Sequence, residues 1–202
     1  MRISLLCEEM IHVSGEANVH IIAGRWKRHR LIVPAVSGLR PTPGRVRETL
    51  FNWLGSGIFG ARCLDLFAGS GALGFEAASR GAAEVVLVDR NKAVVDNLLS
   101  GVRRLAAQEI AVVHSDALRY LKRSSRHFDI VFLDPPFDSD LLETSCRLLA
   151  NSDRLPETAR IYLEMRRPGL QPTLPNEWDL MHSGTAGDVR YLLAGKRVSM
   201  DA

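Results

Sequence analysis

The sequence predicts an α/β protein built on a mostly parallel, seven-stranded sheet that ends in an antiparallel hairpin. From Arg62 onward, short apolar runs alternate with amphipathic segments, as in strands joined by helical crossovers. The last two apolar runs, Trp178–His182 and Val189–Leu193, flank a glycine-containing turn and predict the closing hairpin. With 202 residues, 46% of them hydrophobic, the chain suits one domain with a small appendage. Right-handed crossovers would cover both faces of the sheet with helices.

The first 42 residues are expected to form a loose extension followed by a small β-hairpin. Residues 1–17 show no clear hydrophobic periodicity, so we assign them to the extension. Residues 18–42 contain two short apolar runs, Val19–Ala23 and Leu31–Val33, which predict the two strands of the hairpin. The segment between them, Gly24–Arg30, is expected to be an exposed basic tip, and a loop follows the second strand.

The main domain is expected to span residues 43–202 and to begin with a helix. Thr42 is a good helix N-cap, Pro43 suits the first helical position, and the apolar spacing ends near Gly55. Strands are then predicted at Cys63–Phe67, Glu84–Asp89, Ile110–Val113, Phe128–Leu133 and Ile161–Glu164. The intervening helices are predicted at Ala72–Arg80, Lys92–Arg104, Ala117–Arg123 and Leu141–Ala150.

Positive charge is concentrated near the N-terminus. The stretch from Asn18 to Arg47 contains no Asp or Glu, although the net charge of the whole chain is only +3. Its seven cationic side chains are Arg25, Lys27, Arg28, Arg30, Arg40, Arg45 and Arg47. A basic region on a mildly acidic remainder is typical of proteins that bind a phosphate backbone, and Trp26 adds an aromatic ring to the predicted tip. We therefore expect a nucleic-acid partner.

Other features argue against several classes of protein. No apolar run approaches the roughly 18–20 residues of a membrane span, and the N-terminus lacks the features of a signal peptide. The three cysteines, Cys7, Cys63 and Cys146, are widely spaced, which argues against a disulfide framework or a zinc site. The six histidines lack paired ligand spacing. We expect a cytoplasmic protein without a metal.

A glycine-rich loop with three nearby acids predicts a nucleotide-like cofactor. Gly69, Gly71 and Gly74 satisfy the pattern G-x-G-x-x-G after the first strand of the main domain, and Asp89 lies 20 residues beyond Gly69. This arrangement suits both NAD and S-adenosylmethionine, because an acid at the second strand end accepts hydrogen bonds from ribose hydroxyls. Asp65 favours the latter, since a carboxylate attracts the ammonium of a methionyl group and repels a pyrophosphate.

The acid at the next strand end supports the same choice of cofactor. Asp116 follows the third strand, where its carboxylate can accept a hydrogen bond from an adenine amine. Asp65 or Asp116 taken singly suits a helix N-cap equally well. Acids at three successive strand ends are harder to assign to capping alone.

The segment Phe128–Phe137 ends a buried strand with a carboxylate and two prolines. Asp134, Pro135, Pro136 and Phe137 would form a stiff loop at the carboxyl end of that strand, where open α/β sheets bind their ligands. The loop combines an acidic acceptor, a backbone carbonyl and an aromatic ring. These groups can hold a flat ring that bears an amine, such as a nucleobase, although a proline-rich turn without such a role fits the residues equally well.

These motifs together resemble a known family of enzymes. The set Asp65–Gly74, Asp89, Asp116 and Asp134–Phe137 is similar to the Rossmann-like methyltransferases that act on exocyclic amino nitrogens, whose signature is [D/N/S]-P-P-[Y/F/W]. The stretch Leu39–Leu54, which reads LRPTPGRVRETLFNWL, further resembles the bacterial 16S rRNA (guanine-N2)-methyltransferases. The resemblance extends from about Val19 to Leu193.

The resemblance implies a reaction, a cofactor and a set of site residues. A methyl group would pass from S-adenosylmethionine to the N2 amine of a guanine in 16S rRNA, free or in a 30S subunit or assembly intermediate. The catalytic loop would be Asp134, Pro135, Pro136 and Phe137. Cofactor contacts would come from Asp65, Phe67, Ala68, Gly69, Gly71, Asp89, Asp116 and Arg47. RNA contacts would come from Arg25, Trp26, Lys27, Arg28, Arg30, Arg40 and Arg45, with Arg47 as a further candidate for a phosphate. We expect the enzyme to be a monomer.

Three alternatives stay open at this stage. A DNA adenine-N6 or cytosine-N4 methyltransferase shares the tetrapeptide, although it usually needs a sizeable insertion to read base edges in the groove. An NAD-dependent oxidoreductase shares the glycine pattern but leaves Asp65 and the basic region unexplained. A non-catalytic RNA-binding module would have no need for the intact set of acids.

Overall fold

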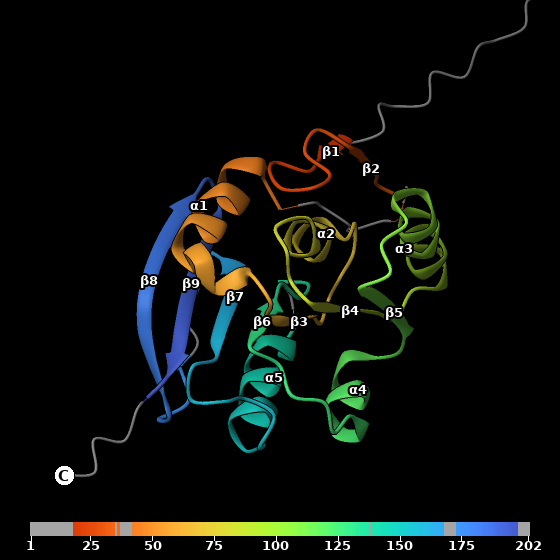
Figure 1. Ribbon diagram of the computed structural model, residues 1–202. Coiled ribbons are helices and arrows are strands. Elements are labelled where there is room, and N and C mark those ends of the chain that lie inside the picture. Colours follow the sequence, from red (N-terminus) through yellow and green to blue (C-terminus); the bar gives the residue numbers. More distant parts are fainter. Residues whose placement is uncertain (1–17, 35, 37–41, 138, 168–172, 198–202) are drawn as a thin grey trace, which may run out of the picture.

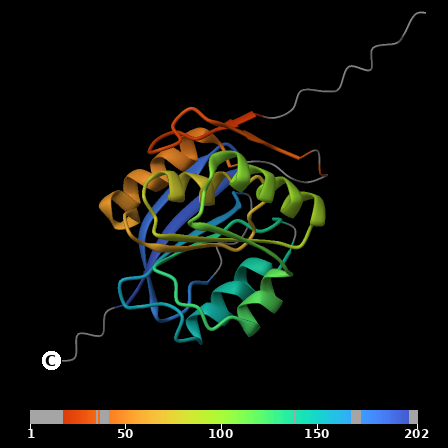
Figure 2. The ribbon, with the colours of Figure 1, turned by 45° about the vertical axis from the view of Figure 1, so that its right-hand side comes forward.

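The computed structural model describes residues 18–34, 36, 42–137, 139–167 and 173–197, so the predicted extension, residues 1–17, lies outside the described part. Figure 1 shows one sheet between two layers of helices. One face is covered by α1 (Gly44–Leu54), α2 (Ala72–Ser79) and α3 (Lys92–Leu105), with the short 3₁₀ helix η1 (Gly55–Ile58) after α1. The other face is covered by α4 (Ala117–Arg123) and α5 (Leu141–Ala150) (Figure 2).

The sheet has seven strands in the order β5-β4-β3-β6-β7-β9-β8. Their bounds are β3 (Arg62–Asp65), β4 (Glu84–Asp89), β5 (Ile110–His114), β6 (Ile130–Leu133), β7 (Arg160–Arg166), β8 (Trp178–Ala186) and β9 (Val189–Lys196). Strands β3 to β7 pair in parallel, whereas β9 is antiparallel to both β7 and β8. The predicted fold class is confirmed. Because the winding reverses between β3 and β6, the carboxyl ends of these two neighbours border the crevice where such sheets bind ligands.

Apolar side chains pack on both faces of the sheet, which explains the continuous apolar runs in the sequence. All four residues of β6 are buried. Phe132 on β6 faces α1 and packs at 6.1 Å between ring centroids from Phe51. Val131, its neighbour on the same strand, belongs to the cluster under α4 and α5. The strands nearest the crevice are therefore held rigidly from both sides.

The N-terminal hairpin lies on the layer formed by α2 and α3 (Figures 1 and 2). Strands β1 (Asn18–His20) and β2 (Arg30–Ile32) are antiparallel, with Val19 opposite Leu31, which confirms the predicted hairpin. Val19 and Leu31 are buried in the same apolar cluster as α1 and α2. The hairpin therefore shares its core with the main domain.

The tip of the hairpin docks on the end of α2, and this overturns one expectation. Trp26 is only 5% exposed, and its backbone N–H donates to Ser79 Oγ at 2.9 Å. The exposed position predicted for Trp26 is therefore wrong, because the large indole is more stable in the core than in solvent. Gly24 permits this docking, since its φ of +81° is left-handed and an added Cβ would lie 1.9 Å from the Ser79 carbonyl oxygen.

The start of α1 also differs from its prediction. Pro43, and not Thr42, is the N-cap of α1, and this cap makes no side-chain hydrogen bond. The Thr42 hydroxyl instead donates to Asp134 Oδ2 at 3.2 Å. The helix N-cap assigned to Thr42 is wrong because a carboxylate 92 positions away in sequence takes that hydroxyl.

Candidate active site

The glycine-rich loop connects β3 to α2 and is held against the end of β4. Asp89 Oδ2 accepts a hydrogen bond from the Gly69 N–H at 3.0 Å, and its Oδ1 accepts from the Asn91 N–H at 2.8 Å. The Ala68 N–H donates to the Val88 carbonyl at 2.9 Å. Gly71 begins α2 with a φ of +78°, and an added Cβ there would lie 2.7 Å from Leu98 Cδ2. The loop therefore depends on glycine for its shape and on Asp89 for its position.

Asp65 lies beneath this loop at the carboxyl end of β3. Its side chain is buried, and Oδ2 accepts a hydrogen bond from the Gly74 N–H in the first turn of α2 at 3.1 Å. The pKa of Asp65 is raised to about 7, chiefly by burial and to a smaller extent by the charge of Asp89, while the hydrogen bond from the Gly74 amide opposes the shift. A carboxylate in this state gains stability from a nearby ammonium group. Phe67, half-buried in the loop above, completes the predicted segment.

Asp116 follows β5 and is the N-cap of α4. Its Oδ1 accepts a hydrogen bond from the Arg119 N–H at 2.9 Å, and the residue is exposed. The helix-cap role weighed for this residue is therefore present. Its predicted contact with an adenine amine stays a prediction.

The Asp134–Phe137 loop leaves the end of β6, directly beside the end of β3. Asp134 is half-buried, Pro135 is buried, and Pro136 is exposed. Phe137 is 41% exposed, which is unusual for a large apolar ring. Burial raises the pKa of Asp134 well above its usual range, and the charges of Glu164 and Asp65 raise it further. The loop thus presents a carboxyl of high proton affinity and an accessible aromatic ring.

Sequence reasoning missed two residues beside Asp134. The Tyr162 hydroxyl donates to Glu164 Oε2 at 2.8 Å, and both side chains are buried on β7. Burial raises the pKa of Glu164 to about 7, although the hydrogen bond from Tyr162 opposes this shift. The signal that could have found it was a glutamate at the end of the otherwise apolar predicted strand Ile161–Glu164, because the preceding predicted strand is followed directly by Asp134.

Arg47, predicted to contact the cofactor or a phosphate, is buried beneath the hairpin, and both contacts stay predictions. Arg47 is 4% exposed; its Nη2 donates to the His20 carbonyl at 3.0 Å, and its Nη1 lies 3.5 Å from Glu76 Oε2. Burial lowers its pKa, whereas the charge of Glu76 raises it. The guanidinium therefore lies against a buried carboxylate and links α1 to α2 and to the hairpin.

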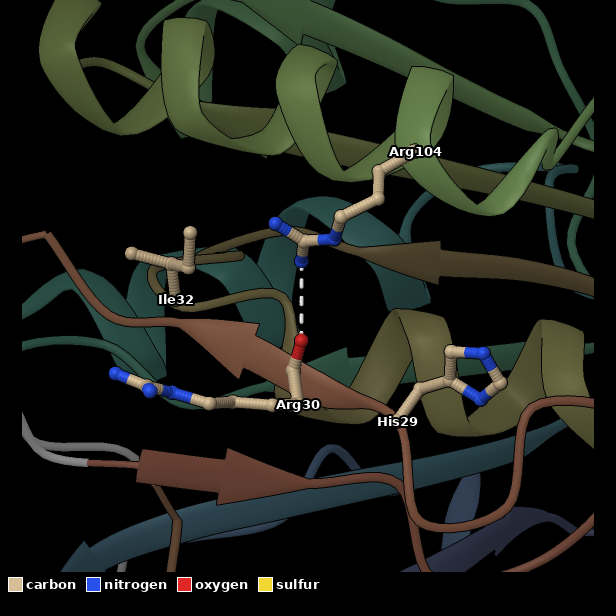
Figure 3. Close-up of a pocket in the computed structure, with 4 residues that line it drawn as sticks. All are labelled: His29, Arg30, Ile32 and Arg104. Atoms are coloured by element: carbon tan, nitrogen blue, oxygen red, sulfur yellow. Dashed lines mark hydrogen bonds between the residues drawn. The ribbon is translucent and has the colours of Figure 1, made fainter.

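The remaining basic residues of the hairpin are exposed. Arg25 pairs with Glu109, and its guanidinium carbon lies 4.3 Å from the centroid of the Trp26 ring. Lys27, Arg28 and Arg30 are exposed at or beside the tip, Arg45 is exposed on α1, and Arg40 lies outside the described residues. Figure 3 shows Arg104 of α3 reaching the Arg30 carbonyl at 3.0 Å, in a hollow also lined by His29 and Ile32.

The hairpin tip and the Asp134–Phe137 loop lie at opposite ends of the parallel strands. Arg25 contacts Ser79 at the end of α2 and Glu109 just before β5, and both positions are at the amino ends of the parallel strands. Asp134 lies at the carboxyl end of β6. A ligand that reaches both regions must therefore extend across the face of the domain.

Two other features are absent from the described ranges. Within them, no group of three His, Cys, Asp or Glu side chains could hold a metal ion. No helix in the part of the chain that the structure describes is long and apolar enough to cross a membrane.

Comparisons with known proteins agree on one family. The family model described as "Conserved hypothetical protein 95" matches residues 19–195. "Ribosomal RNA small subunit methyltransferase D" of Escherichia coli K12 is 45% identical over 180 residues, which cover 89% of this chain and 91% of the relative. The protein of the same name from Haemophilus influenzae is 41% identical over 185 residues, which cover 89% of this chain and 95% of the relative. The solved structure of yhhF from Escherichia coli superimposes with a TM-score of 0.83 at 42% identity, covering 89% of this chain and 98% of that one.

Proposed function

The chain belongs to the family described as Conserved hypothetical protein 95, and on that premise we propose that it methylates 16S rRNA. The reaction transfers a methyl group from S-adenosylmethionine to the exocyclic N2 amine of a guanine. The observation that carries the proposal is the juxtaposition of two loops: the acid-flanked glycine loop after β3 and the Asp134–Phe137 loop after β6 leave neighbouring strands at the same edge.

The residues after β3 and β4 suit S-adenosylmethionine, whose sulfonium supplies an activated methyl group when the cofactor is bound. Asp65, buried and of raised pKa, offers a carboxylate to the ammonium of the methionyl part. Gly69 and Gly71 have no side chains, so the backbone at these two positions can approach the ligand closely. Asp89 would accept hydrogen bonds from the ribose hydroxyls, and Asp116 from the adenine amine.

The catalytic loop would hold the target base in the geometry for attack. The lone pair of an aromatic amine is delocalised into the ring, so the nitrogen is a poor nucleophile. Asp134 and the Pro135 carbonyl would accept hydrogen bonds from its two N–H groups and turn the lone pair toward the methyl group. Phe137, 41% exposed, would stack on the base. Because the loop needs access to the amine, the guanine must be unpaired or flipped out.

The basic hairpin would bind the RNA backbone at a distance from the reacting base. Arg25, Lys27, Arg28 and Arg30 are exposed on the hairpin, and Arg45 is exposed on α1. Such contacts position a nucleic acid without reading its sequence. We propose that the enzyme works as a cytoplasmic monomer on 16S rRNA, free or within a 30S subunit or assembly intermediate.

One experiment separates this function from its alternatives. The protein is incubated with tritiated S-adenosylmethionine and naked rRNA, 30S particles or DNA, and the labelled nucleoside is identified after digestion. We expect N2-methylguanosine from one or both RNA samples. Label in DNA adenine or cytosine would assign the DNA methyltransferase instead, and no label together with NAD binding would favour the oxidoreductase.

A further inference from the structure

A buried carboxyl group, that of Glu164, lies beside the half-buried Asp134. Strands β6 and β7 pair in parallel, with Phe132 opposite Tyr162 and Leu133 opposite Leu163. Continuing this register by one residue places Asp134 beside Glu164. Because side chains alternate along a strand, both acids project to the face on which Phe132 and Tyr162 pack, their ring centroids 6.5 Å apart. Glu164 is 3% exposed, so little water screens its charge.

Tyr162 fixes the position of this carboxyl group. Its hydroxyl donates to Glu164 Oε2 at 2.8 Å, and its ring is fully buried between Phe132 and Tyr191. Tyr191 lies opposite Glu164 on β9. A buried hydrogen bond from an immobile tyrosine leaves the glutamate little freedom to turn away from Asp134.

The charged and titratable groups that act on Asp134 come from two neighbouring strands, and a hydroxyl comes from the segment before α1. Glu164 of β7 and Asp65 of β3 are acidic and raise its proton affinity. Thr42 donates a hydrogen bond to Oδ2 and opposes them. Tyr162 and Tyr191 lie next to Glu164. Two carboxyl groups side by side in a poorly solvated site cannot both ionise easily, so the charge of one makes the other a stronger base.

We propose that Glu164, held by Tyr162, is a positioning residue that makes Asp134 the acceptor of the proton released in methyl transfer. The inference rests on the proposed function. The amine lone pair forms the new N–C bond, and the S–CH₃ bond breaks with its electron pair left on sulfur, which becomes a neutral thioether. The nitrogen then carries a positive charge until one N–H proton passes to the Asp134 carboxylate. The products are S-adenosylhomocysteine, the N2-methylated guanine and protonated Asp134.

The pH dependence of kcat tests this role. Glu164→Gln keeps the shape and the acceptor for Tyr162 but removes the charge. Without that charge the pKa of Asp134 falls. In the pH profile of kcat, the decrease on the acid side (the acid limb) therefore moves to lower pH by about one unit or more. On the plateau kcat falls as well, because Asp134 is a weaker base, while KM for S-adenosylmethionine stays within about two-fold. The matched control is Asp179→Asn, which neutralises an exposed carboxylate on β8 of the same sheet and leaves the limb in place.

Two further results keep the test decisive. Tyr162→Phe retains the ring and removes the donor, so Glu164 holds its proton to higher pH and the acid limb moves the same way by a smaller amount. This variant decides the matter where Glu164→Gln does not fold, as judged by circular dichroism. An acid limb at the wild-type pH in the folded variants overturns the inference. Failure of the wild-type protein to methylate RNA overturns the proposed function instead.

Discussion

Replacing Glu76 by alanine is expected to loosen the hairpin and destabilise the whole domain. Glu76 is fully buried on α2, where its carboxylate accepts hydrogen bonds from the Ile22 N–H at 2.7 Å and the Ala23 N–H at 3.0 Å. It also accepts from Arg80 Nε at 2.7 Å and lies 3.5 Å from Arg47 Nη1. The substitution therefore leaves two amides without an acceptor and one buried cation without its counter-charge.

The size of the effect follows from these lost contacts. An unpaired buried amide costs about 1–3 kcal/mol, and removing one partner of a buried ion pair costs about 3–5 kcal/mol in total. These terms overlap, so we expect the free energy of unfolding to fall by about 4 kcal/mol. For a domain of this size, 1 kcal/mol corresponds to about 2–4 °C in Tm, which gives a decrease of about 8–16 °C.

Thermal unfolding by circular dichroism measures this decrease against a matched control. Asp96→Ala on α3 removes a helical carboxylate that is likewise paired at i,i+4, but its partner Lys92 is exposed. The control should change the stability by at most about 1 kcal/mol. Adding Arg47→Met to Glu76→Ala removes the unpaired cation, so the double variant should be more stable than the sum of the single effects predicts. Equal losses for Glu76→Ala and Asp96→Ala, or strict additivity, would refute the reasoning.

Three further predictions concern the site. Asp134→Ala should abolish methyl transfer and change S-adenosylmethionine affinity by no more than a few-fold; surviving turnover would remove Asp134 from catalysis. Reversing Arg25, Lys27 and Arg28 to Glu should weaken RNA binding and reduce its salt dependence in filter-binding titrations, and unchanged binding would exclude the tip from the interface. Because the pKa of Asp65 is raised to about 7, the carboxylate loses its charge as the pH falls through that value. Calorimetry should therefore find weaker S-adenosylmethionine binding below pH 7 in the wild type, and pH-independent, weaker binding in Asp65→Asn.

The sequence predicted the sheet well because its local patterns and its packing agree. The apolar run before Asp134 became β6, buried on both faces, and the Asn18–Val33 region became a hairpin. Local patterns were also sufficient to place Asp65 and Asp89 at neighbouring strand ends. Such positions follow from chain order and the right-handed crossover rule, so no knowledge of side-chain contacts is needed.

The contacts that the sequence did not reveal all involve partners that are distant in sequence. Thr42 had the right residue type for a helix cap, but its hydroxyl reaches Asp134 instead. Trp26 and Arg47 stand in a basic stretch typical of an exposed surface, yet one packs against α2 and the other faces Glu76. Glu164 was missed because its position beside Asp134 depends on the pairing of β7 with β6. Composition and spacing carry no information on these pairings.

The proposed function gives a reason for the distance between the basic hairpin and the Asp134–Phe137 loop, and that reason is the distribution of charge. Asp65, Asp89, Asp134 and Glu164 lie at or near the carboxyl ends of four strands, where the acids that are ionised would attract a sulfonium or an ammonium group and repel phosphates. An RNA backbone drawn to this edge would lose much of the attraction that basic residues provide. On the proposed function, Arg25, Lys27 and Arg28 at the amino ends of the strands would bind the backbone, so that only an uncharged base would need to enter the acidic crevice. The proposed function therefore predicts that extrusion of the base is favoured electrostatically as well as sterically.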